Sequence, residues 1–126
     1  MGLITKRLAV AGDKGTRVAA ALFDTGASAS VVRRDIVESV ATVLRLPAAK
    51  VHTLGDGVGR LRATETAVLL HVRIRGIRLS DNFVVVKRLA DQMIVGAHTM
   101  QKWWVTLDVE NEELRIDRRV GRMLLA

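Results

Sequence analysis

The chain has 126 residues, no cysteine and a formal net charge of +7. Its length fits one domain spanning residues 1–126, and its hydrophobic content of 49% argues against intrinsic disorder. Without cysteine, disulfides, thiolate metal ligands and cysteine nucleophiles are excluded. No apolar run reaches transmembrane length, and the N-terminus is charged too early for a signal peptide. We therefore expect no membrane segment, and either a cytoplasmic protein or a domain of a larger one.

The first part of the chain predicts two strands and a helix. Leu3 to Val10 is typical of a strand, Gly12 to Gly15 is a turn signal, and Thr16 to Phe23 is a second strand. From Arg34 to Leu46 the apolar residues recur at helical spacing. This spacing predicts a helix that ends at Pro47.

The rest of the chain is rich in strand signals. Val51 to Thr66 is punctuated by glycines and predicts a hairpin, and Ala67 to Val86 predicts two strands that turn at Gly76. Gln92 to Trp104 contains a short strand, a glycine and a short helical turn. Val105 to Asp117 predicts a closing hairpin. Many short strands with one or two short helices indicate a mainly β fold with a barrel-like or sandwich core.

One acidic residue, Asp24, lies in the apolar stretch Ala21 to Val32, "ALFDTGASASVV". A carboxylate next to buried apolar surface is costly unless it is satisfied or used. Gly26 lets the backbone turn closely after it, and the Thr25 hydroxyl can hold that turn by hydrogen bonding to the backbone. Two such carboxylates in contact share one proton and can activate water against a peptide bond. The tripeptide taken alone is also compatible with a simple strand end.

Three motifs together carry a family resemblance. Leu22 to Ser28 resembles the active-site loop of the aspartic proteases, and Ile94-Val95-Gly96 resembles the second signature of their retropepsin-like branch. Gly55 to Arg60, "GDGVGR", stands where that family carries a flap that closes over the substrate. The resemblance covers roughly residues 3–117 and is closest to the cellular retropepsin-like domains. It implies a retropepsin-like acid-protease barrel with its active site at a homodimer interface.

The resemblance also implies roles for individual residues. Asp24 would activate water, and Thr25 and Gly26 would complete the catalytic loop. The residues implied to bind the substrate are Ala27, Ser28, Gly55, Asp56, Gly57, Val58 and Gly59. A strand behind the loop would support it, formed by Ile94, Val95 and Gly96. The resemblance implies no cofactor and no metal.

The chain contains a single Asp-Thr-Gly, whereas the shared-proton mechanism needs two aspartates. The second must come from another copy, and a twofold homodimer places equivalent residues opposite each other. Met1 to Leu8 or Leu114 to Ala126 would then form the dimer sheet. The expected partners are the chain itself and a peptide or unfolded protein substrate. The alternative is a catalytically weak dimerisation or peptide-binding module of the same fold.

The positive charge raises a third hypothesis, a basic nucleic-acid-binding β domain. The arginines are spread along the chain and no set of aromatic side chains for base stacking accompanies them, so no nucleic-acid partner is expected. The glycines of "GDGVG" (Gly55 to Gly59) lack the third glycine of a phosphate-binding fingerprint and no helical pattern follows them. This favours the flap hairpin over a phosphate loop.

Two further kinds of site lack the pattern that they need. The histidines lie at positions 52, 71 and 98: His52, His71 and His98. They have no metal-binding spacing, and the chain has no cysteine to complete a ligand set. Ser28 and Ser30 have neither the sequence context of a serine nucleophile nor an identifiable base. We therefore expect neither a metal site nor a serine hydrolase.

Overall fold

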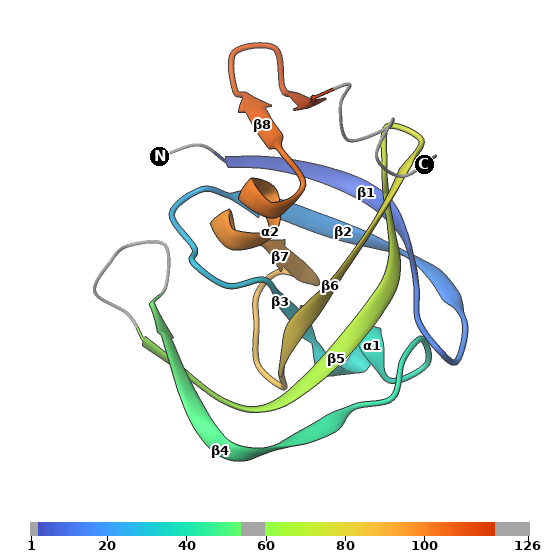
Figure 1. Cartoon of the computed structure of the whole chain (residues 1–126), viewed down its shortest axis with the longest axis vertical. Coiled ribbons are helices and arrows are strands. Elements are labelled where there is room, and N and C mark those ends of the chain that lie inside the picture. The colour runs from blue at the N-terminus through green and yellow to red at the C-terminus, as the bar shows by residue number, and fades with distance from the viewer. Residues whose placement is uncertain (1–2, 54–59, 118–126) are drawn as a thin grey trace.

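The structure is a computed structural model and describes residues 3–53 and 60–117. The strands within these ranges are β1 (Leu3–Ala11), β2 (Thr16–Asp24), β3 (Val31–Arg33), β4 (Leu44–Thr53), β5 (Arg60–Ile74), β6 (Ile77–Val86), β7 (Met93–Val95), β8 (Val105–Asp108) and β9 (Glu113–Ile116). The helices are α1 (Arg34–Val37) and α2 (Ala97–Lys102), and both are short (Figure 1). Neither is long and apolar enough to cross a membrane.

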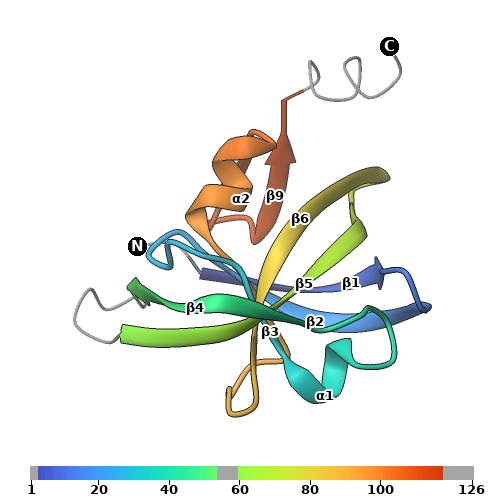
Figure 2. The ribbon, with the colours of Figure 1, turned by 60° about the horizontal axis from the view of Figure 1, so that its bottom comes forward.

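The sheet closes into a barrel. Seven strands are hydrogen-bonded in the order β1-β2-β7-β3-β6-β5-β4, and β1 also pairs with β5 through Val10–Val72 and Ala11–His71. This extra pairing joins the two ends of the run from β1 to β5, so that β4 remains outside as an edge strand on β5 (Figures 1 and 2). Strands β8 and β9 form a separate two-stranded hairpin. The expectation of a mainly β, barrel-like fold with one or two short helices is confirmed, and the described residues form two.

The first predicted hairpin is present, and each strand is one residue longer than predicted. β1 and β2 pair antiparallel from Leu3–Asp24 to Ala11–Thr16, and Gly12 N donates to Gly15 O across the turn at 3.0 Å. Alternate residues of β1 point into the barrel, as the period of a strand requires. The register places Asp24 at the far end of β2 from this turn.

The predicted helix from Arg34 to Leu46 is wrong. α1 ends after one turn at Val37, and from Leu44 the chain is extended as β4. Val40 and Ala41 are buried in the turn between them, so the apolar spacing arises from a short helix followed by a buried turn. β-branched residues in this stretch also reduce its helix propensity.

Pro47 does not end a helix but lies inside β4. The pairing of β4 with β5 shifts register between Arg45 and Lys50, around this proline. An edge strand with a bulge tolerates proline, because its missing N–H is not needed by a neighbouring strand there.

The later hairpins are present, but the second arm of the predicted hairpin and the strand expected from Ala67 form one continuous strand, β5, and β3 was not predicted. β4 and β5 form the expected glycine-containing hairpin, whose tip lies outside the described residues. β5 and β6 turn at Arg75 and Gly76, which have φ of 48° and 80°, and glycine meets this conformation at little cost. The closing hairpin pairs from Val105–Ile116 to Asp108–Glu113.

The core lies inside the barrel and is mainly aliphatic. Phe23, Phe83 and Met93 are among its largest fully buried side chains, and they come from three different strands. Val105 and Leu114 of the β8–β9 hairpin extend the same cluster. The hairpin is thereby fixed to the barrel near α2, at the end of the molecule where β1 begins (Figure 1).

Candidate active site

Asp24 is the last residue of β2, and the chain turns directly after it. Its residue is 9% exposed, and its Oδ1 accepts a hydrogen bond from Gly26 N at 2.9 Å. Ala27 N donates to the Asp24 carbonyl oxygen at 3.2 Å and closes the turn. Among the described residues, the carboxylate is thus held by the backbone of its own loop and by no cation.

The second carboxylate oxygen of Asp24, Oδ2, is not held by the loop in this way. Within the described residues Oδ2 accepts no hydrogen bond, and no buried side-chain oxygen or nitrogen there lacks a partner. Oδ2 is therefore accessible at the surface. One oxygen of the carboxylate is fixed and the other can meet a water molecule, a substrate or a second carboxylate.

β7 runs behind the loop that follows Asp24. It pairs parallel to β2 through Leu22–Ile94 and Phe23–Val95, and antiparallel to β3 through Val31–Ile94. The structure therefore brings the two sequence motifs together, although 70 residues separate Asp24 from Ile94. β7 holds the two arms of the loop at a fixed spacing.

Gly96 makes this close packing possible. A Cβ atom at this position would lie 2.4 Å from the carbonyl oxygen of Ala29 and 2.9 Å from that of Ala27. Ala97 N donates to Ala27 O at 2.7 Å, and His98 N donates to Ser28 O at 3.1 Å. The first amides of α2, which have no partner within a helix, thus hold the carbonyls of the loop.

A chain of side-chain hydrogen bonds fixes the end of the loop. Gly96 N donates to Ser30 Oγ at 3.0 Å, Ser30 Oγ lies 2.5 Å from Thr99 Oγ1, and Thr99 donates to Asp81 Oδ2 at 2.8 Å. Because the Thr99 proton goes to Asp81, the Ser30 hydroxyl donates to Thr99. Lys102 Nζ then lies 3.5 Å from Asp81 Oδ1.

The sequence analysis did not predict this series of hydrogen bonds. Ser30 is a polar residue between apolar ones, so its hydroxyl is expected to have a hydrogen-bond partner. No nearby residue in the sequence indicates that this partner is Thr99, or that Asp81 lies next to it. These residues lie on α2 and β6, which only the tertiary fold brings to the loop.

The hairpin of β4 and β5 reaches the same side of the molecule as loop 25–30. The ends of both strands lie on that side in two views (Figures 1 and 2), and Lys50 and His52 of β4 line a cavity together with Ala29 and Ser30. The predicted flap residues, Gly55 to Gly59, lie outside the described residues. The described part of β4 therefore lies beside the loop.

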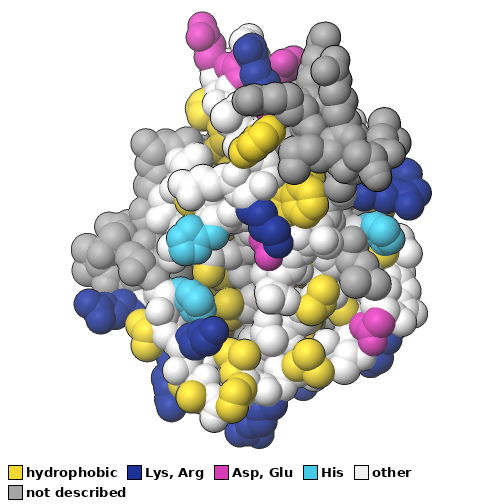
Figure 3. Space-filling view, viewed as in Figure 1, with side chains coloured by type: hydrophobic (Ala, Val, Ile, Leu, Met, Phe, Trp, Pro, Cys, Tyr) yellow, Lys and Arg dark blue, Asp and Glu magenta, His cyan; other side chains and the backbone are white. Residues whose placement is uncertain are grey.

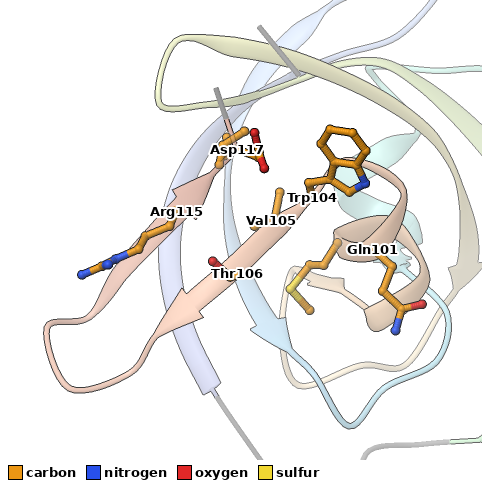
Figure 4. Close-up of a pocket in the computed structure, with 8 residues that line it drawn as sticks. Gln101, Trp104, Val105, Thr106, Arg115 and Asp117 are labelled. Atoms are coloured by element: carbon orange, nitrogen blue, oxygen red, sulfur yellow. The ribbon is translucent and has the colours of Figure 1, made fainter. Parts of the chain in front are cut away.

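Two cavities flank α2. One of about 510 Å³ lies between α2 and the β8–β9 hairpin, where the Arg115 side chain points outward to Asp108 (Figure 4). The other, of about 420 Å³, is lined by Thr25 of the loop and by Val109 next to β8. Asp24 lines neither of them. The exposed Thr25 side of the loop therefore faces the region of the closing hairpin.

The histidines are not gathered into a metal centre. No group of three or more His, Asp or Glu side chains in residues 3–53 and 60–117 is placed to hold a metal ion. His71 lies on β5 opposite Ala11, whereas His52 and His98 line one cavity. The sequence contained no signal for that pairing.

Comparisons with known proteins bear on the fold. No protein-family model and no curated protein sequence matches the chain. The chain is similar in structure to the retroviral protease-like domain of Ddi1 from Leishmania major, with a TM-score of 0.58 and 17% sequence identity. The superposition covers 93% of this chain and 86% of that domain. At this identity the likeness concerns architecture alone, and it establishes that the chain has a retropepsin-like fold.

Proposed function

We propose that the protein is an aspartic endopeptidase that works as a homodimer, with one Asp24 from each copy at a shared site. The observation that carries the proposal is the Asp24 carboxylate, which is nearly buried at a braced loop and keeps one accessible oxygen. A nearly buried acid that pairs with no cation in the described part of the chain is costly for folding alone, so a use for it is expected.

The need for a second copy follows from the chemistry. Asp24 begins the single Asp-Thr-Gly of the chain, and Asp81, the acid tied to the end of the loop, is engaged by Thr99 and Lys102. A twofold axis beside the loop would bring Oδ2 of the two Asp24 residues together. Two carboxylates at that distance share one proton.

The surface around the loop is suited to such an interface. Leu3 pairs with Asp24 across β1 and β2 and is 48% exposed, and Val109 is 49% exposed beside the cavity that Thr25 lines. Each of these exposed apolar side chains would gain from burial against another chain. Burial of these residues by a second copy would also remove water from the paired carboxylates.

The reaction then needs no covalent intermediate. The ionised carboxylate of the pair takes a proton from water while the protonated one hydrogen-bonds the substrate carbonyl oxygen. The water oxygen bonds to the carbonyl carbon, and the C–N bond breaks as the nitrogen receives a proton. An extended peptide would bind between loop 25–30 and the β4–β5 hairpin by strand-like hydrogen bonds.

A mixing experiment tests the shared site. Wild type and Asp24→Asn are unfolded and refolded together, and cleavage of an unfolded protein is measured. With equal amounts, about a quarter of the dimers carry two aspartates, so total activity falls to about half that of the same wild type unmixed. A tenfold excess of the variant lowers it to roughly a tenth.

The outcome separates three possibilities. Activity proportional to wild-type chain concentration, after exchange has been demonstrated, would contradict a shared dyad. A statine-type mimic of the tetrahedral transition state should inhibit the wild type. If the protein binds peptides but cleaves none, it is instead a peptide-binding module of the same fold.

A further inference from the structure

A cavity of about 260 Å³ lies beside the proposed active-site loop, between the loop, β4, β6 and α2. Ala29 and Ser30 contribute the loop side, Lys50 and His52 come from β4, and His98 comes from α2. Figure 3 shows two histidine side chains next to each other on this face, with a Lys or Arg side chain beside them. Three nitrogen-bearing side chains from two distant parts of the sequence therefore converge on one hollow.

The described part of the chain does not engage these side chains. Within the described residues, Lys50, His52 and His98 form no side-chain hydrogen bond or ion pair. Lysine offers three donors, and even a neutral imidazole offers one. The cavity thus presents several donors and a positive charge that no acceptor among residues 3–53 and 60–117 uses.

Asp81 is the acidic residue in the cavity wall, and its charge is already compensated. Its Oδ2 accepts from Thr99 at 2.8 Å, and its Oδ1 accepts from Asn82 N at 2.9 Å and lies 3.5 Å from Lys102 Nζ. Both oxygens of this carboxylate are thus engaged by neighbouring groups. The balance of charge at the opening is therefore positive and favours an anion.

The size of the cavity indicates what kind of anion. Sites for drug-sized ligands have volumes of about 300–1,000 Å³, so 260 Å³ is suited to a single side chain rather than a separate molecule. Leu46 and Val84 provide an apolar part of the wall against which a methylene stem can pack. A carboxylate on a short stem meets both requirements.

We propose that this cavity binds the Asp or Glu side chain of a peptide substrate, so that the protein selects acidic peptides. The proposal rests on the proposed function, because it takes the loop as the place where the peptide lies. A twofold dimer has two such cavities at equal distances from its axis. Acidic side chains should then be favoured at two positions, one on each side of the cleaved bond.

The test compares peptides that differ only by Glu against Gln. A cleaved peptide is varied at each of the four positions before and after the cleaved bond, and kcat/KM is measured. We expect Glu to exceed Gln by about three- to tenfold at one position on each side, as for a partly exposed ion pair. Binding of the same peptides is measured separately by fluorescence anisotropy.

Variants show whether the cavity causes the preference. Lys50→Gln and His98→Gln should each move the Glu-to-Gln ratio towards one. The matched control is Lys87→Gln, which removes one charge at an exposed position outside this cavity and should keep the ratio of the wild type. If Lys87→Gln lowered the Glu-to-Gln ratio of kcat/KM as much as the cavity variants do, the preference would arise from the net charge of the protein, and the proposal would be overturned.

Failure of this inference differs from failure of the proposed function. Cleavage without any difference between Glu and Gln overturns the inference and leaves the endopeptidase intact. Absence of cleavage with Glu-dependent binding that Lys50→Gln abolishes overturns the endopeptidase and supports the cavity. A phosphoserine peptide that binds tightly where the Glu peptide does not would overturn the assignment to carboxylates.

Discussion

At the two ends of β2 the chain is held by the same kinds of contact. At one end Gly12 packs against residues 40 and 41, where a Cβ atom would lie 2.5 Å from Ala41 Cβ, and Asp13 accepts hydrogen bonds from Thr42. At the other end Gly96 packs against Ala29, and Asp81 accepts a hydrogen bond from Thr99. Close glycine packing and a hydroxyl bonded to a carboxylate therefore do not by themselves mark a functional site.

The two ends differ in the state of their carboxylates. Asp13 uses one oxygen for the Thr42 amide, at 2.6 Å, and the other for the Thr42 hydroxyl. Asp24 uses one oxygen for its own loop and leaves the other accessible. A carboxylate with both oxygens engaged joins two turns, whereas one with an accessible oxygen can take part in chemistry.

The largest expected effect comes from exchanging the carboxylates for amides. Asp24→Asn keeps an oxygen for the Gly26 amide but removes the titratable group, so kcat should fall by at least about a hundredfold, the range of acid–base catalysis. Asp13→Asn, the matched change at the other end, should retain peptide cleavage. Circular dichroism shows that both variants are folded. Equal activity of the two variants would remove the distinction between the ends.

The second-largest expected effect is a loss of stability when a glycine at either end of β2 is replaced by alanine. Gly96→Ala forces a methyl group against the Ala29 carbonyl and should lower the free energy of unfolding by about 3 kcal/mol. Gly12→Ala, which meets Ala41 and the Val40 carbonyl, should cost a comparable amount. Urea denaturation measures both.

The activity per folded molecule then separates the two glycine variants. It should fall in Gly96→Ala, because the loop that carries Asp24 is displaced, and should persist in Gly12→Ala. The milder Gly15→Ala, whose Cβ would lie 3.2 Å from Ser39 O, serves as the control for an added methyl group. Full activity of folded Gly96→Ala would show that the loop tolerates displacement.

The smallest effect concerns pH and the Asp13 end. The hydrogen bond from the Thr42 hydroxyl, and then that from the Thr42 amide, hold the pKa of Asp13 below its ordinary value of 3.8. The unfolded chain therefore binds this proton more readily than the folded one. The stabilisation is present above pH 3.8 and is lost as the pH falls below 3.8 through the folded pKa.

Thr42→Val tests this assignment. Removal of the hydroxyl should move the pKa of Asp13 back towards 3.8, as followed by NMR titration of its side-chain carboxyl. The unfolding midpoint of the variant should also change less between pH 5 and pH 3 than that of the wild type. An unchanged Asp13 titration would mean that the amide alone sets its pKa.

Local signals in the sequence were sufficient for most of the elements. The strands of the first hairpin, the turn at Gly76 and the closing hairpin follow from alternation and turn residues, since both act over a few neighbours. The motif at Asp24 and the glycine at position 96 were visible for the same reason. The helix from Arg34 failed because burial of Val40 in a turn imitates helical periodicity, and Pro47 was tolerated by a bulge in an edge strand.

The mainly β, barrel-like class and the acidic residue at a tight turn could be predicted from the sequence, because they depend on the order of residues along the chain. The side chains that complete the loop could not, because they come from segments that meet only in the folded barrel. Ser30, Thr99 and Asp81 meet because β7 passes between β2 and β3 and carries α2 against β6. His52 and His98 share a cavity for the same reason. Contacts between segments so distant depend on how the barrel closes, and no local pattern encodes that closure.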